Sequence, residues 1–127
     1  MSEQRETMIW THSIPQPPVP QFLREMLKDY PEIIQDIQDG LNEIVAKYLE
    51  RKWGTPFNEV SEELESALSH HRFEASEALK EAEQTGDSQA IYKAKIKGDA
   101  VSEAYHVGGA DFDELQNYFE TYRGMFE

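Results

Sequence analysis

The sequence predicts an all-α fold: a small antiparallel helical bundle of four longer helices, with a short N-terminal helix and a proline-rich N-terminal arm. Apolar residues recur at spacings of three and four in four separate segments, which is the repeat of one face of a helix. Alternating apolar runs are absent and β-branched residues are few, which argues against strands. The turns between the helical segments are short, as they are between antiparallel neighbours in a bundle.

The N-terminal arm, residues 1–19, is expected to be extended, and residues 20–127 have the size of a single domain. The segment from Pro15 to Pro20 favours a polyproline II shape and excludes helix before its last proline. Its prolines three apart match the spacing of polyproline ligands. In so small a domain, we expect the segment to pack on the protein's own aromatic side chains. Pro20 suits the first position of a short helix over residues 20–28.

The next helix has the clearest period in the chain. Pro31 suits its first turn, and Gly54 is expected to end it. Its apolar residues form a stripe that is predicted to face the core: Ile34, Ile37, Leu41, Ile44 and Tyr48, with Ile33, Val45 and Leu49 widening it.

Three more helices are expected to follow. Residues 56–84 carry an apolar stripe within roughly 120° of a helical wheel. Gly86 and Asp87 are suitable caps for a turn into a fourth helix, which ends near residue 106. Asp111 with Glu114 resembles a capping box at the start of the last helix. These helices are predicted to add to the core Leu64, Leu68, Val101, Leu115 and Phe119.

The fourth helix is apolar on two sides. Central burial would explain both sides, and so would a contact with a partner or with a second copy of the chain. Three lysines interrupt the second side and disfavour full burial. The first side holds Ala90, Ile91, Ala94, Gly98, Val101 and Tyr105; the second holds Tyr92, Ile96 and Ala100; the lysines are Lys93, Lys95 and Lys97.

Composition excludes several classes of partner. A net charge of −13 argues against direct contact with nucleic-acid phosphates or anionic membranes. The chain has no cysteine, so disulfides and thiolate metal sites are excluded. The first residues lack the basic and apolar regions of a secretory signal, and no apolar run is long enough to cross a membrane. We therefore expect a cytoplasmic protein.

The negative charge is concentrated in the second part of the chain. Residues 1–57 carry a net charge of −3 and residues 58–127 a net charge of −10. On the third helix, five glutamates fall within about 60° on one flank of the apolar stripe. This flank is either a docking surface for a basic protein or a solvated helix face. The glutamates are Glu59, Glu63, Glu74, Glu77 and Glu81.

Aromatic residues away from the helix stripes are the expected anchors of such a surface. Phe73, Tyr92 and Tyr118 lie off the main apolar stripes of their helices. Charges at the rim of an interface chiefly speed association, so these aromatics would have to supply lasting affinity.

No metal, cofactor or catalytic centre is predicted. Glu103 and His106 form one E-x-x-H unit, whereas di-iron bundles use two. His70, Glu74 and Glu77 share a helix face, without a second motif to complete a site. His71 falls in the apolar stripe and is expected to be half-buried with a hydrogen-bond partner. The chain has no cysteine nucleophile, glycine-flanked serine elbow or phosphate-binding glycine motif, so we do not expect an enzyme.

A small, acidic helical domain without catalytic machinery is expected to bind another protein. In size, acidity and compactness the chain resembles immunity proteins and antitoxins, which neutralise toxins such as basic nucleases by direct docking. The resemblance is one of general character, so no functional residue is carried over from it. A DNA-mimic inhibitor is a close variant. The alternatives are a helical-bundle metalloprotein or enzyme, and a structural adaptor or regulatory subunit.

Overall fold

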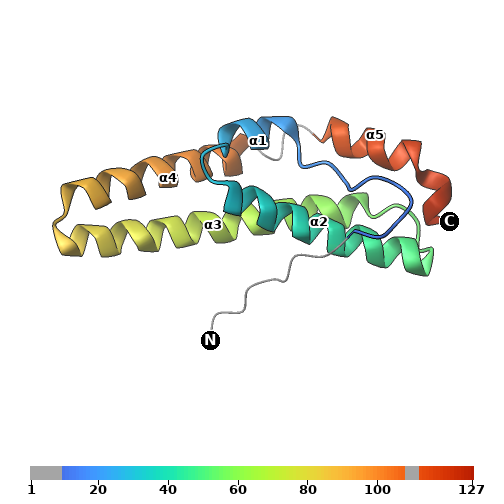
Figure 1. Cartoon of the computed structure of the whole chain (residues 1–127), viewed down its shortest axis with the longest axis horizontal. Helices are drawn as coiled ribbons and strands as arrows, with labels where there is room; N and C mark the ends of the chain where they lie inside the picture. The colour runs from blue at the N-terminus through green and yellow to red at the C-terminus, as the bar shows by residue number, and fades with distance from the viewer. Residues whose placement is uncertain (1–9, 108–111) are drawn as a thin grey trace.

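The structure is a computed structural model that describes residues 10–107 and 112–127. It is all-α, and these residues contain no strand (Figure 1). This confirms the predicted helical bundle. The elements in chain order are α1 (Gln21–Met26), α2 (Pro31–Arg51), α3 (Phe57–Thr85), α4 (Ser88–Val107), α5 (Asp113–Thr121) and the 3-10 helix η1 (Arg123–Phe126).

Helix α3 is the element on which α2, α4 and α5 all pack. Helices α3 and α4 run antiparallel and extend together past the ends of α1 and α2 (Figure 1). Two polar contacts lie near the end of the region in which α2 packs beside α3 and α4: His71 with Asp36, and Lys97 with Glu32. Beyond them, residues 72–96 form a two-helix extension, which we call the distal hairpin.

Local capping signals place the turn at the tip of this hairpin as predicted. Gly86 ends α3 with a φ of +72°, a left-handed conformation in which a side chain would be strained. The Asp87 carboxylate accepts hydrogen bonds from the backbone N–H groups of Gln89 and Ala90, so it caps the start of α4. The two residues therefore fix an abrupt reversal of the chain.

Other helix ends differ from the predicted ones by a few residues. Helix α1 is shorter than expected at both ends, and Pro20 precedes its first residue. Helix α2 ends at Arg51, and Lys52 takes the left-handed conformation before Gly54 does. The last helix ends at Thr121, after which η1 carries the buried Phe126 back into the core. Asp111 of the predicted capping box lies outside the described residues.

The buried line of α2 differs from the predicted stripe. Ile34, Ile44 and Tyr48 are only half-buried at the edge of the core. Residues four apart drift by about 40° around a helix, so a line with this spacing spirals around α2. A helix buries such a ridge when it crosses its neighbour obliquely, and α2 is inclined across α3 (Figure 1). The buried ridge is Ile33, Ile37, Leu41, Val45 and Leu49.

The rest of the predicted core is confirmed. Of the ten residues assigned to it, seven are buried: Ile37, Leu41, Leu64, Leu68, Val101, Leu115 and Phe119.

The described part of the arm, residues 10–19, packs on the protein itself, as expected. Ile14, Pro17 and Val19 are buried. The side-chain amide of Gln38 donates a hydrogen bond to the Pro17 carbonyl at 2.7 Å, and the Tyr118 hydroxyl donates one to the Pro15 carbonyl at 2.6 Å. Both bonds satisfy backbone carbonyls that an extended segment leaves without partners. The arm therefore belongs to the core and is tied to α2 and α5.

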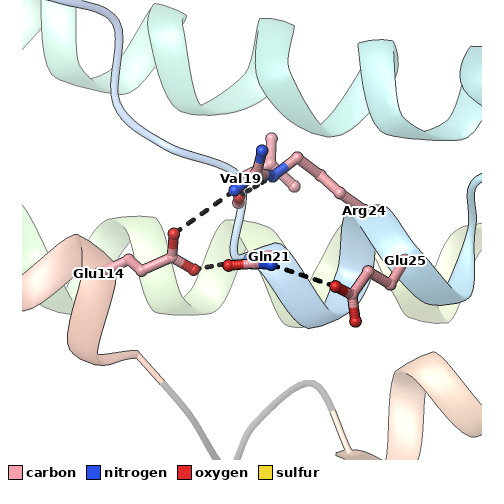
Figure 2. Close-up of polar contacts among 5 residues, drawn as sticks. All are labelled: Val19, Gln21, Arg24, Glu25 and Glu114. Atoms are coloured by element: carbon pink, nitrogen blue, oxygen red, sulfur yellow. Dashed lines mark hydrogen bonds and ion pairs between the residues drawn. The ribbon is translucent and has the colours of Figure 1, made fainter.

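Helix α1 is capped from a distant part of the chain (Figure 2). The Glu114 carboxylate of α5 accepts a hydrogen bond from the Gln21 backbone N–H at 2.6 Å, and its other oxygen lies 3.5 Å from Arg24 Nη2. The Arg24 Nε donates to the Val19 carbonyl at 3.0 Å. In this six-residue helix without a side-chain cap of its own, the N–H of the first residue, Gln21, has no acceptor within the helix. Glu114 supplies that cap and holds α5 against α1.

The oblique ridge of α2 makes a sharp distinction between two adjacent isoleucines. Ile33→Ala should lower the free energy of unfolding by about 2–5 kcal/mol, because Ile33 is 1% exposed and no neighbour can fill the space. Ile34→Ala, the matched control, should cost clearly less because Ile34 is half-exposed. Denaturant unfolding of both variants measures the difference. Equal costs would mean that the buried line has been misplaced.

Because the phenol of Tyr118 is buried, the stability of the fold should change with pH in the alkaline range. Burial, and to a smaller extent the neighbouring Tyr122, raise the pKa of Tyr118 above its ordinary value. The folded state therefore keeps this proton at a pH where the unfolded state has lost it. The stabilisation is complete below about pH 10 and is lost as the pH rises further.

Tyr118→Phe removes this ionisation. At neutral pH the free energy of unfolding of the variant should be about 1 kcal/mol lower, because the variant lacks the hydrogen bond to Pro15. Between about pH 9 and about pH 11, it should then lose less stability than the wild type does. Urea unfolding across this range provides the measurement. Parallel pH profiles for the two proteins would contradict the assignment.

Candidate protein-binding surface

The side of α3 that faces away from the core is strongly acidic. The helix carries eight glutamates against Arg72 and Lys80, a net charge of −6, whereas α4 carries a net charge of +1. Like charges three or four residues apart repel by a few tenths of a kcal/mol per pair. Stability alone would therefore favour more lysines on this side. We call it the acidic side of α3.

The structure divides the five predicted glutamates into two groups. Glu59 and Glu63 lie at the bundle end of α3 and are half-buried, whereas Glu74, Glu77 and Glu81 are exposed on the distal hairpin. The near end is therefore partly covered and the far end faces solvent.

The existing ion pairs of the exposed group are weak. Glu74 pairs with His70 at 2.6 Å and Glu77 with Lys80 at 3.2 Å. Exposed pairs of this kind contribute between zero and about 1 kcal/mol. A basic partner can therefore replace them at little cost.

Two of the three predicted aromatic anchors are exposed. Phe73 is 63% exposed and Tyr92 is 66% exposed. Phe73 lies near the middle of the acidic side, one helical turn from His70 and from Glu77. An exposed apolar ring with polar and charged side chains beside it has the composition of an interface anchor with a polar rim.

The assignment of Tyr118 to the binding surface was wrong. Its side chain is 7% exposed and is held by the bond to Pro15. A position off the apolar stripe of α5 indicates exposure only if the stripe is the one covered face of the helix. The arm covers a second face. The proline-rich arm was expected to pack on aromatic residues, and this pattern in the sequence indicates that an aromatic residue such as Tyr118 can be covered by it.

The second apolar side of α4 is largely exposed. Tyr92 and Ile96 face solvent, with Ile96 44% exposed, while the first side faces α3 and contributes the buried Val101. Central burial of α4 is therefore excluded as the explanation for its two apolar sides. A contact with a partner or with a second copy of the chain stays a prediction.

A groove lies between α3, the last turn of α4 and Phe112, and no sequence pattern predicted it. Its deeper part has a volume of about 400 Å³, with Leu68 and the aromatic rings of Tyr105 and Phe112 among its walls. A shallower part of about 310 Å³ continues it along α3, past Ser66 and Ser69. Both parts are lined by Glu62 and Glu65. These two glutamates lie on the flank of α3 that the helical wheel did not single out, and their proximity to Tyr105 depends on the register of α4.

The histidines have structural partners. His71 is 15% exposed, and its Nε2 lies 2.7 Å from Asp36 Oδ2, which confirms the predicted half-buried histidine with a polar partner. His106, of the single E-x-x-H unit, packs edge-on against Tyr105. Within residues 10–107 and 112–127, no three histidine, aspartate or glutamate side chains are grouped so as to hold a metal ion. No helix in the described part of the chain is long and apolar enough to cross a membrane.

The exposed chemical groups of this surface are mainly carboxylates and aromatic rings. Exposed carboxylates, an exposed aromatic ring and a groove with acidic rims all lie on α3 or its seam with α4. Comparison with known proteins adds no relative: no protein-family model, no curated protein and no solved structure matches the chain.

Proposed function

We propose that this protein binds a basic protein on the acidic side of α3 and blocks it. The class we assign is that of immunity proteins and antitoxins, with a basic toxin such as a nuclease as the partner. The observation that carries the proposal is the exposed Phe73 set among the carboxylates of a helix with a net charge of −6.

The charges and the ring have separate parts in binding. A field of one sign steers an oppositely charged protein and raises the association rate by roughly 10- to 1000-fold at low salt. Exposed charges add little lasting affinity, because water and salt screen them. A large ring that becomes buried in a partner's pocket lowers the dissociation rate instead. The exposure of the Phe73 ring supports this role for it.

The length of α3 is sufficient for such a footprint. From Glu62 to Glu81 the helix rises by about 28 Å at 1.5 Å per residue. A partner lying along this length, with flanking contacts to α4, can bury the roughly 800 Å² per side that a specific interface needs.

Charge reversal on the docking surface should slow association. The variant carrying Glu74→Lys, Glu77→Lys and Glu81→Lys should bind the partner at least about tenfold more slowly at low salt. The matched control reverses three other exposed carboxylates on α4, α5 and the C-terminus, with the same change in net charge: Glu103→Lys, Glu120→Lys and Glu127→Lys. The partner is captured by affinity purification, and its association rate is then measured from about 50 to about 500 mM salt.

The two variants have the same net charge and differ only in where the reversed charges lie, so their comparison separates docking at α3 from an effect of net charge. The docking variant should lose the salt dependence of association, and the control should keep most of it. Equal slowing by both variants would show that only net charge matters, and unchanged rates in both would remove the case for a basic partner.

Truncating the aromatic anchor should act on dissociation. Phe73→Ala should raise the dissociation rate by about tenfold or more, as loss of a central aromatic anchor does, with little change in the association rate. The toxin class is tested in the same system by co-expression. Wild-type protein should restore growth to cells that produce the captured partner, and Phe73→Ala should restore it less. A partner that does not impair growth would contradict the toxin assignment while leaving the docking surface intact.

A further inference from the structure

We infer that the groove between α3 and α4 is a subsite for one arginine side chain of the basic partner. The inference rests on the proposed function and names the chemical group that this part of the surface recognises. It uses Glu62, Glu65 and Tyr105, none of which is changed in the docking variant or in its control.

The groove combines an apolar floor with charged rims. Leu68 is buried beneath it, and Tyr105 is half-buried in its wall. Glu62 and Glu65 are exposed at its edge. An arginine side chain has the matching division, with an apolar stem that lies along apolar surface and a charged head that bonds to carboxylates.

The two carboxylates suit a guanidinium better than an ammonium group. Glu62 and Glu65 are three residues apart and therefore neighbours on the helix surface, with Cβ atoms about 5–6 Å apart. A guanidinium presents five N–H donors in a flat fork and can bond to two acceptors at once. An ammonium group is a compact, strongly hydrated charge and loses more hydration on a half-apolar wall.

Arg72 of the protein itself already contacts the ring of Tyr105. Its Cζ lies 5.0 Å from the centre of the Tyr105 ring, within the range of a cation–π contact. The ring is therefore held in an orientation that accepts a guanidinium. Arg72 also repels a second cation at its own end, so the partner's arginine is directed toward Glu62.

The groove continues past the hydroxyl groups of Ser66 and Ser69. Hydroxyl groups both donate and accept hydrogen bonds. They can pair with the backbone of an extended segment that carries the arginine. The subsite therefore fits an exposed arginine on a loop or terminus of the partner.

The subsite can be tested without the partner. Isotope-labelled protein is titrated with N-acetyl-arginine amide, and with N-acetyl-lysine amide for comparison, while backbone amide NMR signals are recorded. Arginine amide should produce saturable shifts centred on Glu62, Glu65, Ser69 and Tyr105, and should bind several-fold more tightly than lysine amide. The double variant Glu62→Gln, Glu65→Gln should weaken this binding by about tenfold or more, because it removes both charge-assisted pairs.

A matched control separates the groove from the general acidic field. Glu77→Gln with Glu81→Gln removes the same number of charges from the same helix and should leave arginine binding within about twofold. Equal weakening by both double variants, shifts spread evenly along α3, or equal affinity for lysine amide would overturn the subsite. All four substitutions are at exposed positions, and the amide spectrum itself reports whether each variant is folded.

The outcomes also distinguish this inference from the proposed function. If arginine amide fails to bind while the docking-surface variants still slow the partner, the subsite is wrong and the docking surface stands. If arginine amide binds in the groove while those variants have no effect on the partner, the groove stands and the docking surface is wrong.

Discussion

The apolar stripe of α3 is the constraint on which the rest of the structure depends. Helices α2, α4 and α5 all pack on this one helix, so the position of each of them depends on it. At 29 residues α3 is about 43 Å long, whereas α2, with 21 residues, is about 31 Å long. Helix α2 is too short to cover all of α3. In the distal hairpin, the main neighbour of α3 is therefore α4.

This difference in length explains where charge can be tolerated. A helix in a protein is held chiefly by the packing of its apolar face, and propensity and surface pairs add less. Helix α3 as a whole can therefore carry a net charge of −6 and stay helical. At the bundle end the neighbouring elements half-bury Glu59 and Glu63, while the distal carboxylates and Phe73 stay open to solvent. The exposed charges of this surface contribute little to holding the fold together, which leaves them free for the binding role that we propose.

Features determined by nearby residues could be predicted from the sequence. The turn at Gly86 and Asp87 follows from backbone conformation and capping, and the polar partner of His71 follows from its position within the stripe. Features that depend on how elements cross could not be predicted. Because α2 crosses α3 obliquely, Ile33 is buried in the core and the predicted Ile34 is not. Tyr118 is covered by the arm, which lies more than one hundred residues away in the sequence. The groove depends on the register of α4 against α3, which single-helix patterns do not encode.

Hydrogen exchange measured on the free protein and on its complex tests the central claim most directly, because it reports opening and covering of the backbone along the whole chain. In the free protein, the amides of residues 72–96 should exchange faster than those of residues 33–49, since the distal hairpin packs on fewer neighbours. In the complex, exchange should slow in peptides that cover Glu62 to Glu81 and stay unchanged in α2 and α5. Slowing confined to α2 or α5, with no change along α3, would contradict the account.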